Sequence, residues 1–163
     1  MSRAFVKEGT NEDARPPERM VEDGPNPVTP EGLAQIEGHV ARIEAALKTE
    51  TNELLRETLA RDLRYWTVRK ASAEVVTPTD SDTVAFGSTV TIRRNGREQT
   101  FRIVGVDEAN ATKGLISVHS PLAQAVLGTR LGDFIDADAP LGEIEIMQVG
   151  VRSADSTIAT RTG

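Results

Sequence analysis

The sequence from Thr29 to Leu47 reads TPEGLAQIEGHVARIEAAL, and its apolar pattern predicts a helix that packs against a second helix. Thr29 is a good N-cap residue, Pro30 suits the first helical position, and Glu31 suits the positive end of the helix dipole. Apolar residues then recur in alternating steps of three and four, which is the heptad pattern of a coiled coil. The seam residues are Leu33, Ile36, Val40, Ile43 and Leu47.

A second helix follows after a short break. The pattern stops at residues 48–52, where Thr49 or Thr51 is able to cap a new helix. Two seamed helices joined by a few residues form an antiparallel hairpin, which we assign to residues 29–76. With about 20 residues per helix at 1.5 Å each, this hairpin is about 30 Å long. The second seam consists of Leu55, Leu59, Leu63, Trp66 or Tyr65, Val68 or Arg69, and Ala73.

The segments on both sides of the hairpin differ from it in composition. Residues 1–28 combine prolines and acids with few apolar residues, which predicts a disordered acidic tail. Residues 77–151 predict about five strands and one short helix, with Asn95-Gly96 as a two-residue hairpin turn. Residues 152–163 predict a flexible tail. The expected fold class is therefore α+β, a coiled-coil hairpin followed by a sheet domain.

The composition excludes several classes of protein. The 163 residues carry a net charge of −6, contain no Cys and include two His. Disulfide scaffolds, thiolate metal sites and multi-histidine metal centres are therefore excluded. The acidic balance disfavours a free nucleic-acid-binding protein. No apolar run approaches the roughly 18 residues of a membrane span, and residues 1–24 lack the apolar core of a signal peptide. We therefore expect a cytoplasmic protein without membrane association.

No catalytic constellation is visible in the sequence. His39 and His119 lie in different segments without a nucleophile motif, so both are expected to be packing or surface residues. The acidic run of Asp133, Asp136 and Asp138 is expected to be a solvated turn and strand edge. We therefore predict that the chain is not an enzyme and holds no cofactor or metal of its own.

Two acidic residues stand beside the predicted turn of the hairpin. Glu50 and Glu53 are three residues apart. Two carboxylates on one turn are able to hold a hard cation such as Mg²⁺ together with acids from another protein. In the alternative interpretation, both acids only favour the start of the second helix through its dipole.

Several short motifs occur in a fixed order between residues 84 and 149. They are VAFGSTV at 84–90, FRIVG at 101–105 followed by Asp107-Glu108, ISVHSPLAQAVLG at 116–128, Gly132-Asp133, and APLG at 139–142. In this order they resemble the C-terminal domain of the Gre family of bacterial transcription elongation factors. VTPEG at 28–32 also resembles the start of the family's first helix, so the resemblance covers residues 28–150.

The resemblance implies a fold and a partner. It implies an FKBP-like C-terminal domain that docks on the rim of the secondary channel of RNA polymerase, and a coiled coil that enters this channel. In the family, two acids at the coiled-coil tip help to hold the second catalytic Mg²⁺ and promote cleavage of backtracked RNA. Glu50 and Glu53 match their spacing, with Glu50 in place of the usual Asp.

The resemblance also implies contact residues. The docking signature corresponds to Ser117, His119, Ser120 and Pro121, with His119 where an Asn is usual. Four arginines of the second helix are expected either to face acidic channel walls or the nascent RNA end, or to form ordinary salt bridges on the helix surface. They are Arg56, Arg61, Arg64 and Arg69.

Three alternatives remain open. The predicted hairpin is about ten residues per helix shorter than the family's arm, which removes about 15 Å of reach, so the chain resembles non-cleaving relatives such as the regulator of nucleoside diphosphate kinase. An FKBP-like isomerase or chaperone would need an aromatic-lined pocket. The aromatic candidates for such a pocket are Phe86, Phe101 and Phe134.

A structural module would self-associate through the hairpin, where Leu54 and Leu55 are adjacent. A protruding arm predicts a monomer instead.

Overall fold

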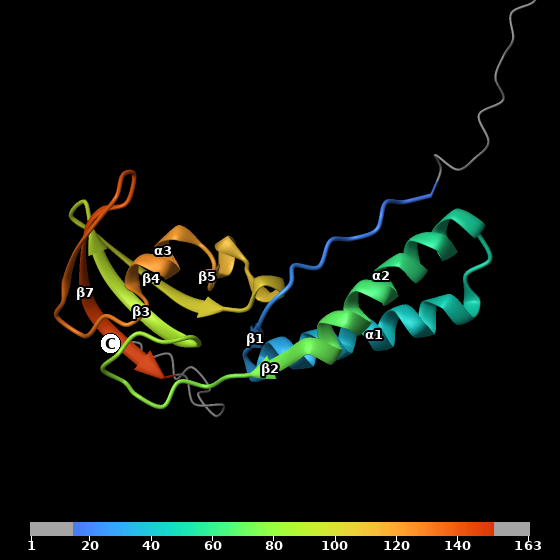
Figure 1. Cartoon of the computed structure of the whole chain (residues 1–163), viewed down its shortest axis with the longest axis horizontal. Coiled ribbons are helices and arrows are strands. Elements are labelled where there is room, and N and C mark those ends of the chain that lie inside the picture. Colours follow the sequence, from blue (N-terminus) through green and yellow to red (C-terminus); the bar gives the residue numbers. More distant parts are fainter. Residues whose placement is uncertain (1–14, 152–163) are drawn as a thin grey trace, which may run out of the picture. The chain divides into compact units, whose positions relative to one another are not determined.

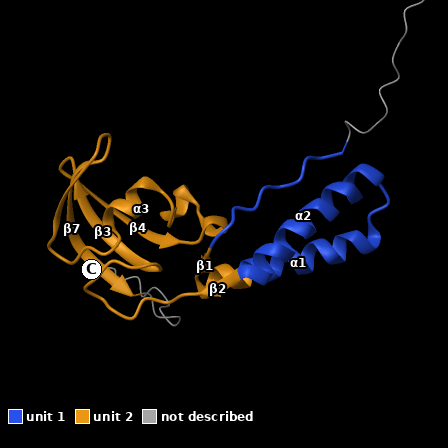
Figure 2. Cartoon of the chain, viewed as in Figure 1, with its two compact units in different colours: residues 1–24, 35–72 blue, residues 25–34, 73–163 orange. Residues whose placement is uncertain are grey.

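The computed structural model describes residues 15–151, which form a helical hairpin and a mixed β-sheet with one short helix (Figure 1). The chain divides into two compact units (Figure 2). The helical unit comprises Met1–Gly24 and Gln35–Ser72, and the sheet unit comprises Pro25–Ala34 and Ala73–Gly163. The predicted α+β class is confirmed, and the predicted tail at residues 152–163 lies outside the described residues.

The hairpin consists of α1 (Pro30–Thr49) and α2 (Glu53–Ser72), each of 20 residues. All five predicted seam residues of α1 are at least partly buried. In α2 the structure selects Trp66 and Arg69 at the two open positions, because both are buried while Val68 is about half exposed. Their spacing of three places them on one face of the helix.

A short parallel strand pair stands where the sequence predicted tail and helix. β1 (Asn26–Val28) pairs with β2 (Ala73–Val75), with Val28 opposite Val75. The disordered tail was predicted to include residues 26–28, and the hairpin to continue to residue 76. Strands of three residues are too short to show an alternating pattern, so the sequence gives no signal for them.

The sheet unit contains a five-stranded sheet in the order β5-β4-β3-β7-β6. The β4–β5 pair is parallel, and the other three pairs are antiparallel. Two short 3-10 helices, η2 (Val106–Glu108) and η3 (Ala111–Lys113), connect β4 to β5. The strands are β3 (Ser88–Arg94), β4 (Arg97–Val104), β5 (Leu115–Ser117), β6 (Phe134–Ala137) and β7 (Gly142–Val151).

The core of the sheet unit lies between the sheet and α3 (Pro121–Val126). Ser120 is the N-cap of α3, and its hydroxyl accepts a hydrogen bond from the amide of Ala123 at 3.3 Å. Gly128 follows α3 with φ 80°, a left-handed conformation that favours glycine and ends the helix as predicted. The buried core residues are Val84, Val90, Ile92, Phe101, Ile103, Ala123, Val126, Ile144, Ile146 and Val149.

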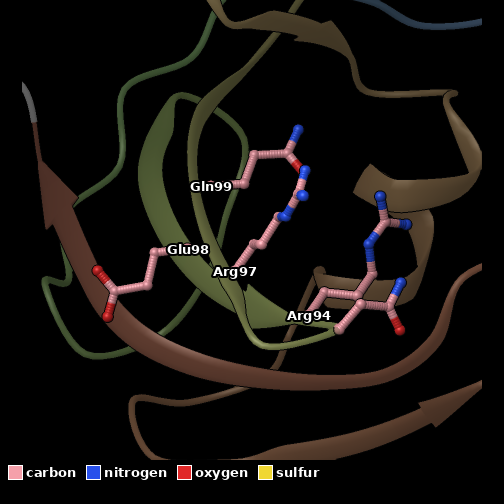
Figure 3. A pocket seen from close by; sticks show the side chains of 5 residues that line it. Arg94, Arg97, Glu98 and Gln99 are labelled. Carbon is pink, nitrogen blue, oxygen red and sulfur yellow. The ribbon is translucent and has the colours of Figure 1, made fainter.

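The predicted turn at Asn95-Gly96 is confirmed. Both residues have positive φ, 53° and 72°, as a primed two-residue hairpin turn requires. The turn sets Arg94 opposite Arg97 in the β3–β4 ladder. Side chains then alternate along β4, so Arg97 and Gln99 project one way and Glu98 the other (Figure 3).

Candidate functional site

The tip of the hairpin holds Glu50 in a fixed position. Its Oε1 accepts hydrogen bonds from the amides of Thr51 at 3.0 Å and Asn52 at 2.9 Å. Asn52 in turn accepts a hydrogen bond from the amide of Leu55 at 3.1 Å, which makes Asn52 the residue that caps α2. The sequence interpretation had placed the cap at Thr49 or Thr51. One oxygen of the Glu50 carboxylate is thus engaged within the turn.

Glu53 is the other predicted tip acid, and it differs from Glu50. It is exposed at the first position of α2 and makes no hydrogen bond or ion pair with any residue in 15–151. Leu54 and Leu55 beside it are 53% and 51% exposed, so the tip also presents apolar surface. The structure therefore brings a free carboxylate and a tethered carboxylate to the same turn.

Arg56 joins the two helices at the tip. Its Nη1 donates to the carbonyl of Leu47 at 2.8 Å and to that of Glu50 at 2.7 Å. The last carbonyls of a helix lack partners within the helix, so this guanidinium caps α1 from the neighbouring helix. Arg56 was predicted as a contact to RNA or polymerase, and the structure gives it an internal role.

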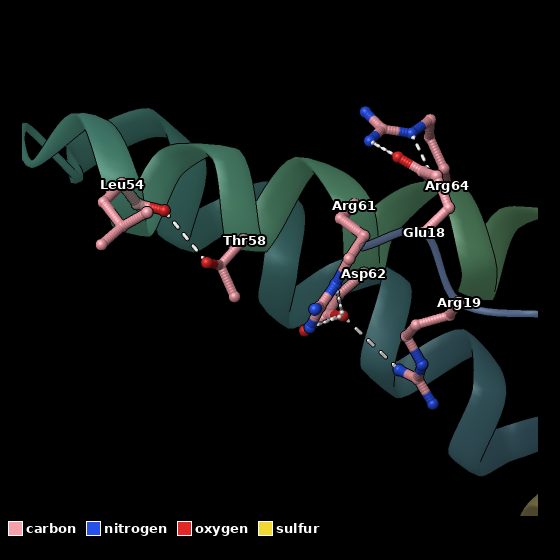
Figure 4. A network of polar contacts seen from close by, with 7 residues as sticks. All are labelled: Glu18, Arg19, Leu54, Thr58, Arg61, Asp62 and Arg64. Atoms are coloured by element: carbon pink, nitrogen blue, oxygen red, sulfur yellow. Dashed lines mark hydrogen bonds and ion pairs between the residues drawn. The ribbon is translucent and has the colours of Figure 1, made fainter. Parts of the chain in front are cut away.

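Arg61 and Arg64 have acidic partners in the helical unit (Figure 4). Arg61 binds Asp62, with Nη2 and Oδ1 2.8 Å apart. Arg64 binds Glu18 through two hydrogen bonds, of which the Nε–Oε2 contact measures 3.3 Å. The hydrogen bond from Arg64 lowers the pKa of the Glu18 carboxyl, and Glu18 raises the pKa of Arg64.

These contacts show that residues 15–19, within the predicted disordered tail, follow α2. Besides the Glu18–Arg64 pair, Arg15 lies 3.6 Å from Glu57, and Arg19 lies 3.6 Å from Asp62. Each of the three contacts joins opposite charges from the two segments, with Glu18 on Arg64 and Arg19 on the earlier Asp62. Each exposed pair contributes little by itself, and together they place residues 15–19 alongside α2. The remainder of the predicted tail, residues 1–14, lies outside the described residues.

An aromatic cluster lies beside this charged series. The guanidinium carbon of Arg19 lies 3.7 Å from the ring centre of Tyr65, a cation–π distance. Trp66 packs edge-on against Tyr65 and stacks on His39, with ring centres 4.1 Å apart. His39 is therefore a packing residue, as expected. Arg69 is only 7% exposed, so its predicted role as a surface contact does not fit this structure.

A buried carboxylate binds the first turn of α1 within the sheet unit. Glu108 of η2, 7% exposed, accepts hydrogen bonds from the Thr29 amide at 3.1 Å, the Gly105 amide at 2.9 Å and the Thr29 hydroxyl. A Cβ on Gly32 would lie 2.2 Å from the Glu108 carboxyl carbon. We call these four residues the clasp. All four belong to sequence motifs of the family resemblance, but no local pattern predicts that they meet.

A second polar contact lies near the clasp. Arg102 is largely buried, and it donates to the carbonyl of Gly87 at 3.1 Å and lies 3.4 Å from Glu31. Hydrogen bonding to its own backbone and the charge of Arg102 lower the pKa of the Glu31 carboxyl. Glu31 was predicted to act only through the helix dipole.

The predicted docking signature divides into internal and exposed residues. The Ser117 hydroxyl accepts a hydrogen bond from the His119 amide at 3.1 Å, and Ser120 caps α3. Both serines therefore shape the turn into α3. The side chains of His119 and Pro121 are exposed. The signature thus presents two side chains at the surface.

Other candidate sites find no support in the described part of the chain. Among residues 15–151, no group of three His, Cys, Asp or Glu side chains is arranged to hold a metal ion. Phe101 is buried in the core, whereas Phe134 is 77% exposed on edge strand β6, so the two do not line a common aromatic pocket. None of the helices described in the structure is long and apolar enough to cross a membrane.

A two-helix hairpin with acids at its tip and a mixed-sheet unit that carries the SPLAQAVLG motif define a Gre-type factor. The family model "Transcription elongation factor, GreA/GreB, C-term" matches residues 78–151. GreA from Nitratidesulfovibrio vulgaris is 33% identical over 150 residues, which cover 77% of this chain and 92% of the relative. The chain belongs to the GreA/GreB family.

Further comparisons cover different parts of the relatives. GreA from Alkalilimnicola ehrlichii is 41% identical over 87 residues, 50% of this chain and 55% of that protein. The solved GreA/GreB elongation factor from Nitrosomonas europaea aligns with 78% of this chain and 98% of its own, at 24% identity and a TM-score of 0.38. The family assignment rests on the sequence matches alone.

Proposed function

We propose that this chain is an accessory factor of bacterial RNA polymerase that regulates transcription elongation from the secondary channel. The observation that carries the proposal is the hairpin tip, where Glu50 and Glu53 stand at the end of two 20-residue helices. Family membership supports the same partner. In this proposal the sheet unit docks through His119 and Pro121, the arm enters the channel, and the protein acts in the cytoplasm as a monomer.

In the first form of the proposal, the tip acids stimulate cleavage of backtracked RNA. Glu53 supplies an unengaged carboxylate, and Glu50 keeps one oxygen free of the backbone amides of the turn. Carboxylate oxygens are the ligands that Mg²⁺ prefers, and the ion itself would belong to the polymerase. Arg61 and Arg64 lie further along the same helix, and to contact an acidic channel wall or the RNA end they would have to release Asp62 and Glu18.

The second form is occupancy of the channel without cleavage. It is favoured by the tether on Glu50, because ligation through both oxygens would cost two hydrogen bonds in the turn. The arm length of about 30 Å favours it as well, since metal ligation tolerates distance errors of only about 0.2 Å. Such a factor would slow entry of substrates and exit of RNA instead of shortening the RNA.

One assay separates these forms. Backtracked elongation complexes are incubated with the wild-type protein, with Glu53→Ala, with Glu50→Gln plus Glu53→Ala, and with the matched control Glu44→Gln on an exposed position of α1. Cleavage stimulation predicts RNA shortening that both tip variants lose and the control keeps. Occupancy predicts no shortening but slower nucleotide addition. RNA shortening that survives in the double variant would refute the role of the tip acids.

Binding and oligomeric state are tested separately. A pull-down that recovers no polymerase subunit would refute the proposed partner. Sedimentation measures the oligomeric state, and a monomer is expected. A dimer that is lost when Leu54 and Leu55 are replaced with Ser would instead favour the self-associating module. A peptide isomerisation assay tests the FKBP-like isomerase.

A further inference from the structure

Two arginines at the β3–β4 turn have no partner in the part of the chain that the structure describes. Arg94 and Arg97 make no side-chain hydrogen bond or ion pair with any residue between 15 and 151, whereas their neighbour Arg93 lies 3.3 Å from Glu98 and 3.4 Å from Glu145. Arg94 and Arg97 are also direct cross-strand neighbours. Like charges in that position destabilise a sheet, so folding alone gives no reason for this pair.

The register places both arginines on one face with Gln99. Arg94 pairs with Arg97, and the next pair on the same face is Ile92 with Gln99. Ile92 is fully buried in the core. The two arginines therefore lie on the core-facing side of the sheet, but past its last core residue. Figure 3 shows Glu98 turned away from the others. The Glu98 carboxylate, although it borders the space beside the turn, is therefore directed toward Arg93 on the opposite face, where Glu145 lies as well.

The space beside this face is an open concavity of about 560 Å³. Only polar and charged residues line it, so it does not suit an apolar ligand. The residues are Arg94, Asn95, Arg97, Glu98 and Gln99. Guanidinium groups bind carboxylates and phosphates through paired N–H donors, and the Gln99 and Asn95 amides add donors for the same oxygens.

One observation favours carboxylates over nucleic acid. Single strands bind to proteins largely by stacking of bases on aromatic side chains, and no aromatic residue lines this concavity. We propose that the face formed by Arg94, Arg97 and Gln99 binds an acidic segment of a partner protein. This site lies in the sheet unit and does not require the hairpin or its proposed function.

The test measures fluorescence anisotropy of a labelled peptide of alternating Asp and Glu residues. Arg94→Ala and Arg97→Ala are expected to weaken binding by about threefold each, and the double variant by about tenfold, as for exposed charge pairs. Arg93→Ala removes the same charge from the opposite face, together with the ion pairs that Arg93 makes there. It is expected to change peptide binding by no more than about a factor of 1.5. Circular dichroism checks that each variant is folded.

Each outcome decides the proposal. Absence of peptide binding to the wild-type protein overturns it. Equal weakening by Arg93→Ala and Arg97→Ala also overturns it, because only net charge would then matter. A single-stranded RNA oligonucleotide serves as the competing probe. If this RNA binds more tightly than the peptide, with the same dependence on Arg94 and Arg97, the site belongs to nucleic acid and the proposed partner class is wrong.

Discussion

Replacing Gly32 with Ala should destabilise the protein, although the same change at Gly38 in the same helix should stabilise it. Ala in place of Gly favours a helix by up to about 1 kcal/mol. At Gly38 the new Cβ would lie 3.2 Å from the flexible end of Arg42, which is able to move. At Gly32 it would lie 2.2 Å from the carboxyl carbon of Glu108, whose side chain is buried.

The expected size follows from the bonds that Glu108 would lose. Carbon atoms in contact are about 3.5–4.0 Å apart, so the carboxylate must move by more than 1 Å. It accepts three hydrogen bonds, and a hydrogen bond to a charged group is worth about 1.5–3 kcal/mol. Loss of two of them, less the helix gain, gives about 2–5 kcal/mol of lost stability.

Urea unfolding followed by circular dichroism measures this effect. With an m-value of about 2 kcal/mol/M, the midpoint should fall by about 1–2.5 M in Gly32→Ala and rise slightly in Gly38→Ala. Glu108→Ala alone should also destabilise. In that background Gly32→Ala should cost little, because the atoms that it strikes are gone. A Gly32→Ala midpoint as high as that of Gly38→Ala would refute the clasp.

Three further predictions concern caps and ion pairs. Arg56→Ala removes both hydrogen bonds to the end of α1 and should lower the free energy of unfolding by about 1–2 kcal/mol, with faster amide exchange at residues 47–52. Ser120→Ala removes the N-cap of α3 and should cost about 0.5–2 kcal/mol in thermal unfolding. Because Arg64 lowers the pKa of Glu18, their ion pair stabilises the segment above the ordinary pKa of 4.5 and is lost as pH falls through the lowered value. NMR shifts of residues 15–19 should report this acid transition, and Glu18→Gln should remove it.

Contrary results are equally specific. Unchanged exchange at the tip of Arg56→Ala would mean that the last carbonyls of α1 have other partners. If Ser120→Ala has the same thermal stability as the wild type, the Ser120 hydroxyl does not stabilise α3. An acid transition that persists in Glu18→Gln would assign it to another carboxyl.

Local patterns predicted the elements but not the contacts between distant residues. The heptad steps of α1 and the Asn95-Gly96 turn act over a few residues, so the sequence shows them directly. The partners Glu108 and Thr29 are 79 residues apart, and Glu18 and Arg64 are 46 apart. No local pattern specifies which charges meet over such separations.

For the candidate site at the hairpin tip, too, the sequence predicted the positions of residues but not their contacts. The spacing of Glu50 and Glu53 placed both acids at the tip correctly. It gave no sign that Glu50 would bind the amides of its own turn. The four arginines looked alike in sequence. Val68 and Arg69 were equal candidates for one position of the second seam, so the sequence did not predict that Arg69 is buried. Their separate roles follow from packing alone.

The β1–β2 pair has a consequence for how arm length is able to change. The chain leaves β1 at Val28 and returns to β2 at Ala73, and the two strands are hydrogen-bonded neighbours. The whole helical hairpin between these two residues therefore starts and ends at fixed points, whatever the length of its helices. Adding or removing one heptad from each of α1 and α2 would preserve the seam and leave both stem strands in register. Relatives with longer or shorter arms are therefore accessible by paired insertions or deletions, without redesign of the sheet.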